Sequence, residues 1–285
     1  MKSNNDWNTV IKPKSGWFSV NFREIWQYKD LIIMFLKRNF NSAYKQTVLG
    51  PLWFVITPLF SSGIYTLIFG KIANISTDGV PHFLFYLCSN TAWGYFSSCL
   101  TSTASTFTSN ASLFGKVYFP RLVSPITKVI YALLSFFIHF VMLIIAMLVY
   151  NVNGSFIVPS AHLILLPVMI LQMALLGLGI GIIISTVTTK YRDLSILVSY
   201  GVQLWMYATP VVYPVSQVHT MSASLSRLIM LNPVAPIINN FRYAVLGCGS
   251  MNYTYWFISW VVTLFVLFIG IIIFNRVEKT FMDTV

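Results

Sequence analysis

The sequence predicts an all-α integral membrane protein with six transmembrane helices. Of its 285 residues, 56% are hydrophobic and only 9% are charged, whereas a soluble domain carries about 25% charged residues. So few charges cannot cover a water-facing surface, and the mean hydropathy of +0.74 agrees with a membrane protein. Lys and Arg also gather on one side of the apolar stretches, as is typical of membrane topology.

Six apolar stretches of about 20 residues are long enough to cross a bilayer as helices. We expect these spans at residues 50–69, 82–106, 125–150, 160–188, 194–212 and 255–274. The run from 129 to 189 carries no formal charge and must hold two spans. Its segment NVNGSFIVPS favours a turn between them, because Asn, Gly and Pro interrupt regular structure.

The first span is preceded by a predicted cytoplasmic segment, residues 1–46, and the transmembrane domain covers residues 47–285. Over 26–44, apolar side chains recur near helical spacing, with Lys37 and Arg38 between them. This pattern predicts an N-terminal amphipathic helix at the cytoplasmic membrane interface, which could also pack on a soluble partner. No apolar stretch with a small-residue cleavage site lies in the first ~30 residues, so we expect no cleaved signal peptide.

Between spans five and six, residues 215–252 are too polar and too interrupted to cross the membrane. They nevertheless contain the apolar sequence LSRLIMLNPVAPIINNFRYAVLG, with Pro233 and Pro236 in its middle. We expect two short outer re-entrant helices that enter the leaflet and return, because backbone groups in lipid need partners within helices. A plain extracellular loop is the alternative interpretation.

The charge distribution orients the chain. Fourteen of the eighteen Lys and Arg residues lie in the N-terminal segment, the loops after spans two and four, or the C-terminal tail, and Lys128 lies just inside span three on the same side. The other side holds Lys71, Arg227 and Arg242. The side rich in Lys and Arg is the cytoplasmic one, so six spans place both termini in the cytoplasm.

The chemistry of an enzyme is missing from the sequence. None of the seven acidic residues lies in the middle of a span, where an ion-coupled carrier usually needs a carboxylate. There is no G-x-x-x-x-G-K-[ST] motif, and the three cysteines lack metal-ligand spacing. His139, deep within a span, is a packing residue or a proton relay. The net charge of +11 is divided among span ends, which indicates topology rather than nucleic-acid binding. We therefore expect no catalytic centre, no metal and no cofactor on this chain.

Aromatic side chains are abundant, with 23 Phe, 15 Tyr and 8 Trp. Many lie at span ends, where interfacial belts are the usual explanation. Others could line a path for sugar rings, whose C–H faces stack on aromatic faces. Trp205 and Tyr207 are two such residues, and the main candidates are Trp53, Phe54, Tyr65, Trp93, Tyr95 and Phe96. The hydroxyls of SSCLTSTASTFTSN could face a polar substrate, or its small residues could serve helix packing.

Four segments resemble the transmembrane subunits of ABC polysaccharide exporters, which export O-antigen, teichoic acid or capsule. FLKRNFNSAYKQTVLGPLWFVITPL is similar to the start of their first span, and TKYRDLSILVSYGVQLWMYATPVVYP to their fifth. NPVAPIINNFRYAVLG resembles their outer re-entrant segment, and FNRVEKTFMDTV their C-terminal tail. These matches occur in the expected order along nearly the whole chain.

The resemblance implies a permease that works as a homodimer with two copies of a separate ABC ATPase. That partner would bind and hydrolyse ATP with Mg, which agrees with the missing phosphate loop. The cargo would be a lipid-linked polysaccharide, carried on polyprenyl pyrophosphate in the case of O-antigen. The location would be the bacterial inner membrane, which the chain crosses several times.

Residue roles follow from the same resemblance. The loop NASLFGKVYFPRLVSP looks like the coupling helix, which would dock on the ATPase through Phe114, Lys116, Tyr118, Phe119 and Arg121. An ordinary charged loop is the alternative. Clustered cations at the cytoplasmic face could recruit the anchor phosphates or simply fix topology, namely Lys37, Arg38 and Lys45.

Two other functions stay open at this point. The cargo could be capsule polysaccharide, teichoic acid or a small drug, although the form QLWMYATPVVYP favours O-antigen. The chain could instead be a membrane-embedded glycan-modifying enzyme, which its few carboxylates argue against. An isolated chain that modified glycans without a partner would favour the enzyme.

Overall fold

The structure is a computed structural model, and it describes residues 22–44, 47–114, 119–155, 157–191 and 193–280. Throughout these residues the regular secondary structure is helical. The helices are α1 (Phe22–Gln27), α2 (Lys29–Tyr44), η1 (Gly50–Leu52), α3 (Trp53–Tyr65), η2 (Thr66–Ile72), α4 (His82–Ala104), α5 (Thr106–Phe114), α6 (Val123–Val152), η3 (Ala161–Leu165), α7 (Leu166–Lys190), α8 (Leu194–Tyr207), α9 (Val215–Met221), α10 (Ala223–Leu231), α11 (Val234–Leu246) and α12 (Tyr253–Thr280).

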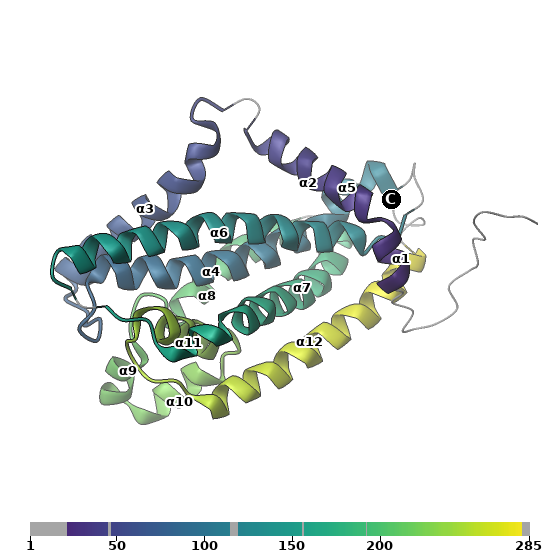
Figure 1. Cartoon of the computed structure of the whole chain (residues 1–285). Helices are drawn as coiled ribbons and strands as arrows, with labels where there is room; N and C mark the ends of the chain where they lie inside the picture. Colours follow the sequence, from purple (N-terminus) through teal and green to yellow (C-terminus); the bar gives the residue numbers. More distant parts are fainter. Residues whose placement is uncertain (1–21, 45–46, 115–118, 156, 192, 281–285) are drawn as a thin grey trace, which may run out of the picture.

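The long helices form a bundle built around α4. Helix α4 packs against α6 and α7, and α12 packs on α7 from the other side. Figure 1 shows these helices running between two ends of the molecule, with α1 and the last turns of α12 at the same end. The opposite end carries α9, α10 and α11. Consecutive long segments alternate in direction between the two ends, so each loop returns the chain for another pass.

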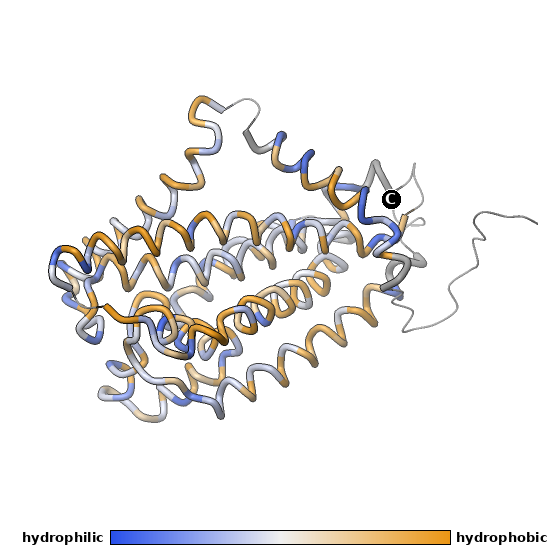
Figure 2. Tube along the Cα trace, in the orientation of Figure 1, coloured by the Kyte–Doolittle hydropathy of each residue, from blue (hydrophilic) through white to orange (hydrophobic). Residues whose placement is uncertain are grey.

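Within the described residues, four segments are long and apolar enough to cross a membrane: Gly50–Ile72, Val123–Val152, Ala161–Thr189 and Tyr253–Arg276. Helix α4 is also long but more polar, and α8 is a shorter apolar helix. Figure 2 shows the difference, with α6 and α12 mostly orange and α4 paler. Helix α8 ends at Tyr207 rather than near the expected residue 212, because Pro210 follows and disfavours helical backbone before it.

Glycines on α7 allow close contact with both neighbouring helices. A Cβ atom on Gly181 would lie 2.5 Å from the Thr103 Cβ and 2.8 Å from the Leu100 carbonyl oxygen, both on α4. A Cβ on Gly179 would lie 2.9 Å from the Leu267 Cα on α12. Small residues bring helix backbones together in membranes, where apolar side chains gain nothing from leaving lipid. Helix α7 therefore packs closely against α4 on one face and against α12 on the other.

The end of the bundle that carries α9, α10 and α11 has three short helices where the sequence predicted two. Ser222 separates α9 from α10, because its extended backbone lets the hydroxyl accept a bond from the Leu225 amide as an N-cap. Pro233 is the N-cap of α11, and Pro236 lies in its first turn, where a missing amide costs little. Twelve of the thirteen residues of α11 are buried, so this helix closes the end of the bundle.

The predicted amphipathic helix is present as two helices, α1 and α2, joined at Tyr28. Phe35 on α2 is buried in a small cluster with Phe107, Phe119 and Phe274. The rings of Phe35 and Phe119 meet edge to face with centroids 5.8 Å apart. This cluster attaches α2 to the ends of the α5, α6 and α12 helices.

Candidate functional site

Three of the predicted sugar-path aromatics meet in one pocket. Trp53 and Phe54 on α3, and Tyr95 on α4, line a pocket of about 300 Å³ together with α6 residues that include His139. His139 forms a hydrogen bond with the backbone of Phe54, so it holds α3 near α6. An open pocket with aromatic walls and a few hydroxyl groups can accept the apolar face of a sugar ring.

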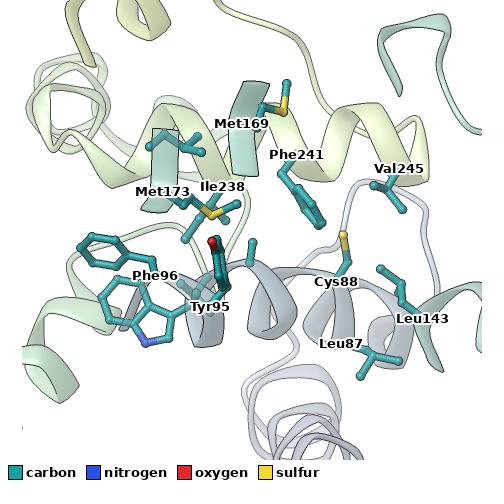
Figure 3. Close-up of a cluster of buried hydrophobic side chains, with 14 of the residues drawn as sticks. Leu87, Cys88, Tyr95, Phe96, Leu143, Met169, Met173, Ile238, Phe241 and Val245 are labelled. Atoms are coloured by element: carbon teal, nitrogen blue, oxygen red, sulfur yellow. The ribbon is translucent and has the colours of Figure 1, made fainter. Parts of the chain in front are cut away.

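The other three aromatics lie elsewhere. Phe96 is fully buried and Trp93 is 5% exposed, and both pack against Trp205 on α8 with centroids 5.4 and 6.4 Å away. Figure 3 shows Phe96 and Tyr95 on α4 facing Met173 on α7. Tyr65 packs on Tyr86 and donates a hydrogen bond to the Met206 sulfur. Trp93 and Phe96 thus belong to the buried core, whereas Tyr65 is half-buried and packs against it.

Some hydroxyl groups on α4 donate hydrogen bonds to carbonyl groups of the same helix. Thr91 donates to the Leu87 carbonyl and Thr101 to the Ser97 carbonyl, each one turn earlier at 2.8 Å. Thr103 and Ser89 are buried against the neighbouring helices. Within the Ser- and Thr-rich segment 97–110, Thr101 and Thr103 agree with helix packing, whereas Ser98 lines the pocket beside Tyr95.

The predicted coupling loop is partly described. Lys116 and Tyr118 lie outside the described residues, and so does the side chain of Phe114, the last residue of α5. Phe119 is buried against Phe35, and Arg121 is half-buried just before α6. Phe119 therefore connects the loop to α2, and any force on the loop would also act on that helix.

The predicted phosphate-recruiting cations have different surroundings. Lys37 is exposed on α2, and Lys45 lies outside the described residues. Arg38 donates a hydrogen bond of 3.1 Å to the side-chain oxygen of Asn110, and its guanidinium lies 4.8 Å from the Phe35 ring centroid. Asn110 in turn donates to Ser124 on α6, at a kink in α5. Arg38 thus has a structural role that Lys37 does not share.

Arg242 lies buried at the end of the bundle that carries α9, α10 and α11, and no role was predicted for it from the sequence. Arg242 on α11 is 2% exposed, donates to the Ser89 hydroxyl at 3.2 Å and to the Pro210 carbonyl at 3.0 Å, and lies 4.2 Å over the Phe85 ring. No carboxylate forms a salt bridge with it in the part of the chain that the structure describes. Arginine stays charged in proteins, so these dipoles and the ring stabilise its charge. One signal was available: an arginine on the side poor in Lys and Arg needs a specific reason to be there.

A second polar network joins α7, α12 and α11. Trp256 donates to the Gln172 side-chain oxygen at 2.7 Å, and the Gln172 amide donates to the Ser259 hydroxyl at 2.8 Å. Ser259 donates in turn to the Pro233 carbonyl at the start of α11. Each of these three side chains is hydrogen-bonded, so the network fixes the position of α11 on the bundle.

Comparison with known proteins assigns this arrangement to a family. The family model of the ABC-2 type transporter membrane domain matches residues 30–246. The chain is 28% identical over 255 residues to the O-antigen export system permease protein RfbA of Klebsiella pneumoniae, which covers 89% of this chain and 94% of that protein. It is 29% identical over 220 residues to the O-antigen export system permease protein RfbA of Myxococcus xanthus, with coverage of 77% and 82%. The chain belongs to the ABC-2 type transporter family.

Proposed function

We propose that this chain is the permease subunit of an ATP-driven ABC exporter. It moves a lipid-linked polysaccharide, O-antigen on polyprenyl pyrophosphate, from the cytoplasm across the bacterial inner membrane. The observation that carries this proposal is the family match over residues 30–246, together with relatives named as O-antigen export permeases along most of the chain. A capsule or teichoic acid cargo is the alternative within the same transport mechanism.

The proposed topology has six crossings, outer re-entrant helices and both termini in the cytoplasm. The alternating direction of α3, α4, α6, α7, α8 and α12 supports six crossings. The distribution of Lys and Arg supports the orientation. In this orientation α2 and α5 lie at the cytoplasmic face, and α9, α10 and α11 lie at the outer face.

The proposed assembly is a homodimer with two ATPase copies, which hydrolyse ATP with Mg. Exposed apolar side chains on α3 and η2, such as Phe60 on α3 and Leu67 on η2, support a second copy or lipid on this face. Native mass spectrometry of the complex extracted from membranes should give two permease and two ATPase chains. A complex with one permease would contradict this assembly.

Coupling to the ATPase is assigned to Phe114, Lys116, Tyr118, Phe119 and Arg121. Arg121→Ala should abolish the stimulation of ATPase activity by lipid-linked glycan while the basal activity remains. The control is Lys71→Ala, an exposed cation at the far end of η2. Phe119→Ala is a weaker test, because loss of the buried ring also destabilises the contact with Phe35. Unchanged stimulation in Arg121→Ala would remove the assignment.

Recruitment of the anchor phosphates is assigned to Lys37, Arg38 and Lys45. Lys37→Glu is the cleanest test, because Lys37 is exposed and charge reversal there leaves the Arg38–Asn110 bond intact. We expect weaker activation by lipid-linked glycan and an unchanged melting temperature. If activation is unchanged in both Lys37→Glu and Arg38→Glu, these cations serve topology alone.

The glycan path is assigned to the pocket lined by Trp53, Phe54 and Tyr95, with Tyr65 farther along α3. Trp93 and Phe96 would support it from the buried core. Trp53→Ala should slow transport in proteoliposomes, since Trp53 is 47% exposed and its ring can stack on sugars. Trp26→Ala on α1 is the control, because Trp26 is exposed but lies outside the pocket.

Transport itself is tested by reconstitution of the chain with its ATPase in proteoliposomes. Lipid-linked glycan added on the ATPase side should become accessible to a glycan-cleaving enzyme on the other side, only with ATP. Glycan that stays inaccessible with ATP in a folded complex would contradict the exporter. Chemical modification of the glycan by the chain alone would favour the enzyme.

A further inference from the structure

A polar pocket lies beside the short helices α9, α10 and α11, away from the proposed glycan path. It has a volume of about 480 Å³, within the range of small-molecule sites, and Arg227 and His219 line it. Ser226, Asn239 and Tyr255 add hydroxyl and amide groups to its wall. The pocket therefore combines the permanent positive charge of Arg227 with several hydrogen-bond donors.

The cation in this pocket has no partner in the protein. No hydrogen bond or ion pair engages Arg227 within the residues that the structure describes, and the same holds for His219. The one carboxylate of the pocket, on Asp78, accepts a hydrogen bond of 2.7 Å from Ser216. Arg227 is thus available to an anion from outside the chain.

A second arginine lies behind the pocket wall. Asn239 lines the pocket, and its side-chain oxygen accepts a hydrogen bond of 3.3 Å from the guanidinium of Arg242. Two arginines against one carboxylate leave this region with a positive charge, because Arg242 forms no salt bridge among the described residues. Together with Lys71 they are the only Lys and Arg residues on this side of the predicted topology.

Leucines on the same helix indicate that the ligand is a lipid. Leu225, Leu228 and Leu231 recur every three residues on α10 and are 48%, 67% and 59% exposed. At this spacing they share one face of the helix, next to the pocket-lining Arg227. An apolar face beside a cation is typical of a helix that lies in the membrane interface, where lipid phosphates are located.

We infer that this pocket binds the phosphate head of a lipid at the outer membrane surface, with Arg227 as the main contact and the lipid tail along the α10 leucines. The guanidinium offers two parallel donors to phosphate oxygens, and His219 and Tyr255 can add further donors. The head group belongs to a phospholipid or to the pyrophosphate anchor of the cargo. That the pocket faces the outer side of the membrane rests on the proposed function and topology. That it binds a lipid phosphate does not depend on them.

The test is photo-crosslinking of the full-length purified chain in neutral detergent with a benzophenone-bearing prenyl pyrophosphate. Mass spectrometry maps the labelled peptides, which separates this pocket from the cations on α2. We expect labelling of the segment 215–255. Arg227→Gln should reduce that labelling about tenfold or more at a subsaturating probe concentration. Lys71→Gln is the matched control, because Lys71 is exposed but outside the pocket, and it should change the labelling less than about twofold.

Competitors identify the source of the phosphate. Competition by short-chain phosphatidylglycerol indicates a phospholipid, and competition by farnesyl pyrophosphate alone indicates the anchor. Inorganic pyrophosphate that competes as well as its farnesyl ester would overturn the lipid part of the inference. Equal labelling of Arg227→Gln and wild type would overturn the site. Because labelling needs no ATPase and no transport, a failed export assay with intact labelling would refute only the proposed function.

Discussion

The helices α3 and α4 follow each other in the chain and have opposite surroundings. Helix α3 and the turn η2 that extends it are strongly apolar, yet the buried residues of α3 are only Pro58 and Ser62. Helix α4 is more polar, yet 15 of its 23 residues are buried. In a soluble protein the more apolar helix would be the more buried one.

This difference shows how a membrane changes the meaning of hydrophobicity. Lipid is as apolar as leucine, so an apolar side chain gains little from burial, whereas small and hydroxyl side chains allow close packing. Helix α4 has Ser89, Thr91 and Thr103 at buried positions and meets the glycines of α7. Phe60 on α3 and Leu67 on η2 are exposed, where lipid or a second copy can cover them.

A Phe→Ala substitution should destabilise the protein much more on α4 than on α3, and this is the largest difference that we expect. Phe85→Ala on α4 removes a fully buried ring that lies 4.2 Å under the Arg242 guanidinium. We expect the free energy of unfolding to fall by about 3 to 5 kcal/mol. Phe60→Ala on α3, which is 69% exposed, should change it by less than about 0.5 kcal/mol. Titration with a denaturing detergent measures both, and equal effects would contradict the burial difference.

A glycine pair tests the packing of the two helices. Gly181→Ala places a methyl group against Thr103 and the Leu100 carbonyl, so α7 and α4 must separate. The expected loss of stability is about 1 to 3 kcal/mol. Gly63→Ala on α3 meets nothing within 4 Å and should be neutral or stabilising by up to about 1 kcal/mol. Melting temperatures in detergent compare them, and a more stable Gly181→Ala variant would refute close packing.

The smallest expected effect is at the contact between the two helices. Asn90 on α4 donates a hydrogen bond of 2.8 Å to the Ser61 hydroxyl on α3. Hydrogen bonds between membrane helices contribute about 0.6 kcal/mol on average, so Asn90→Ala should cost about that much. A double-mutant cycle with Ser61→Ala isolates the pair. A coupling above about 2 kcal/mol would mean that α3 is held more firmly than its exposure indicates.

Hydropathy predicted the long helices close to their observed bounds, because lipid exposure requires about 20 apolar residues whatever the contacts. The expected 125–150 span corresponds to α6, Val123–Val152, and the expected 255–274 span to α12, Tyr253–Thr280. Local caps were harder to predict. Ser222 divides α9 from α10 through one side-chain bond, and hydropathy carries no signal for it.

The surroundings of the candidate site residues could not be predicted from the sequence. Aromatic content suggested six sugar-path residues, but composition does not indicate which way a helix faces. Trp53 lines a pocket while Phe96 is fully buried in the core. The partner of Arg38 lies 72 residues away at Asn110, a separation that no local pattern reveals. The Arg242 network depends on contacts to Ser89 and Pro210, which only the folded bundle brings together.

The central claim is that this chain transports glycan only with a separate ATPase. Its most direct test is purification of the tagged chain from native membranes, followed by an ATPase assay of the proteins that accompany it. We expect a stoichiometric ABC ATPase whose rate of hydrolysis increases with added lipid-linked glycan. A folded chain that purifies without an ATPase and still moves or modifies glycan would contradict the claim.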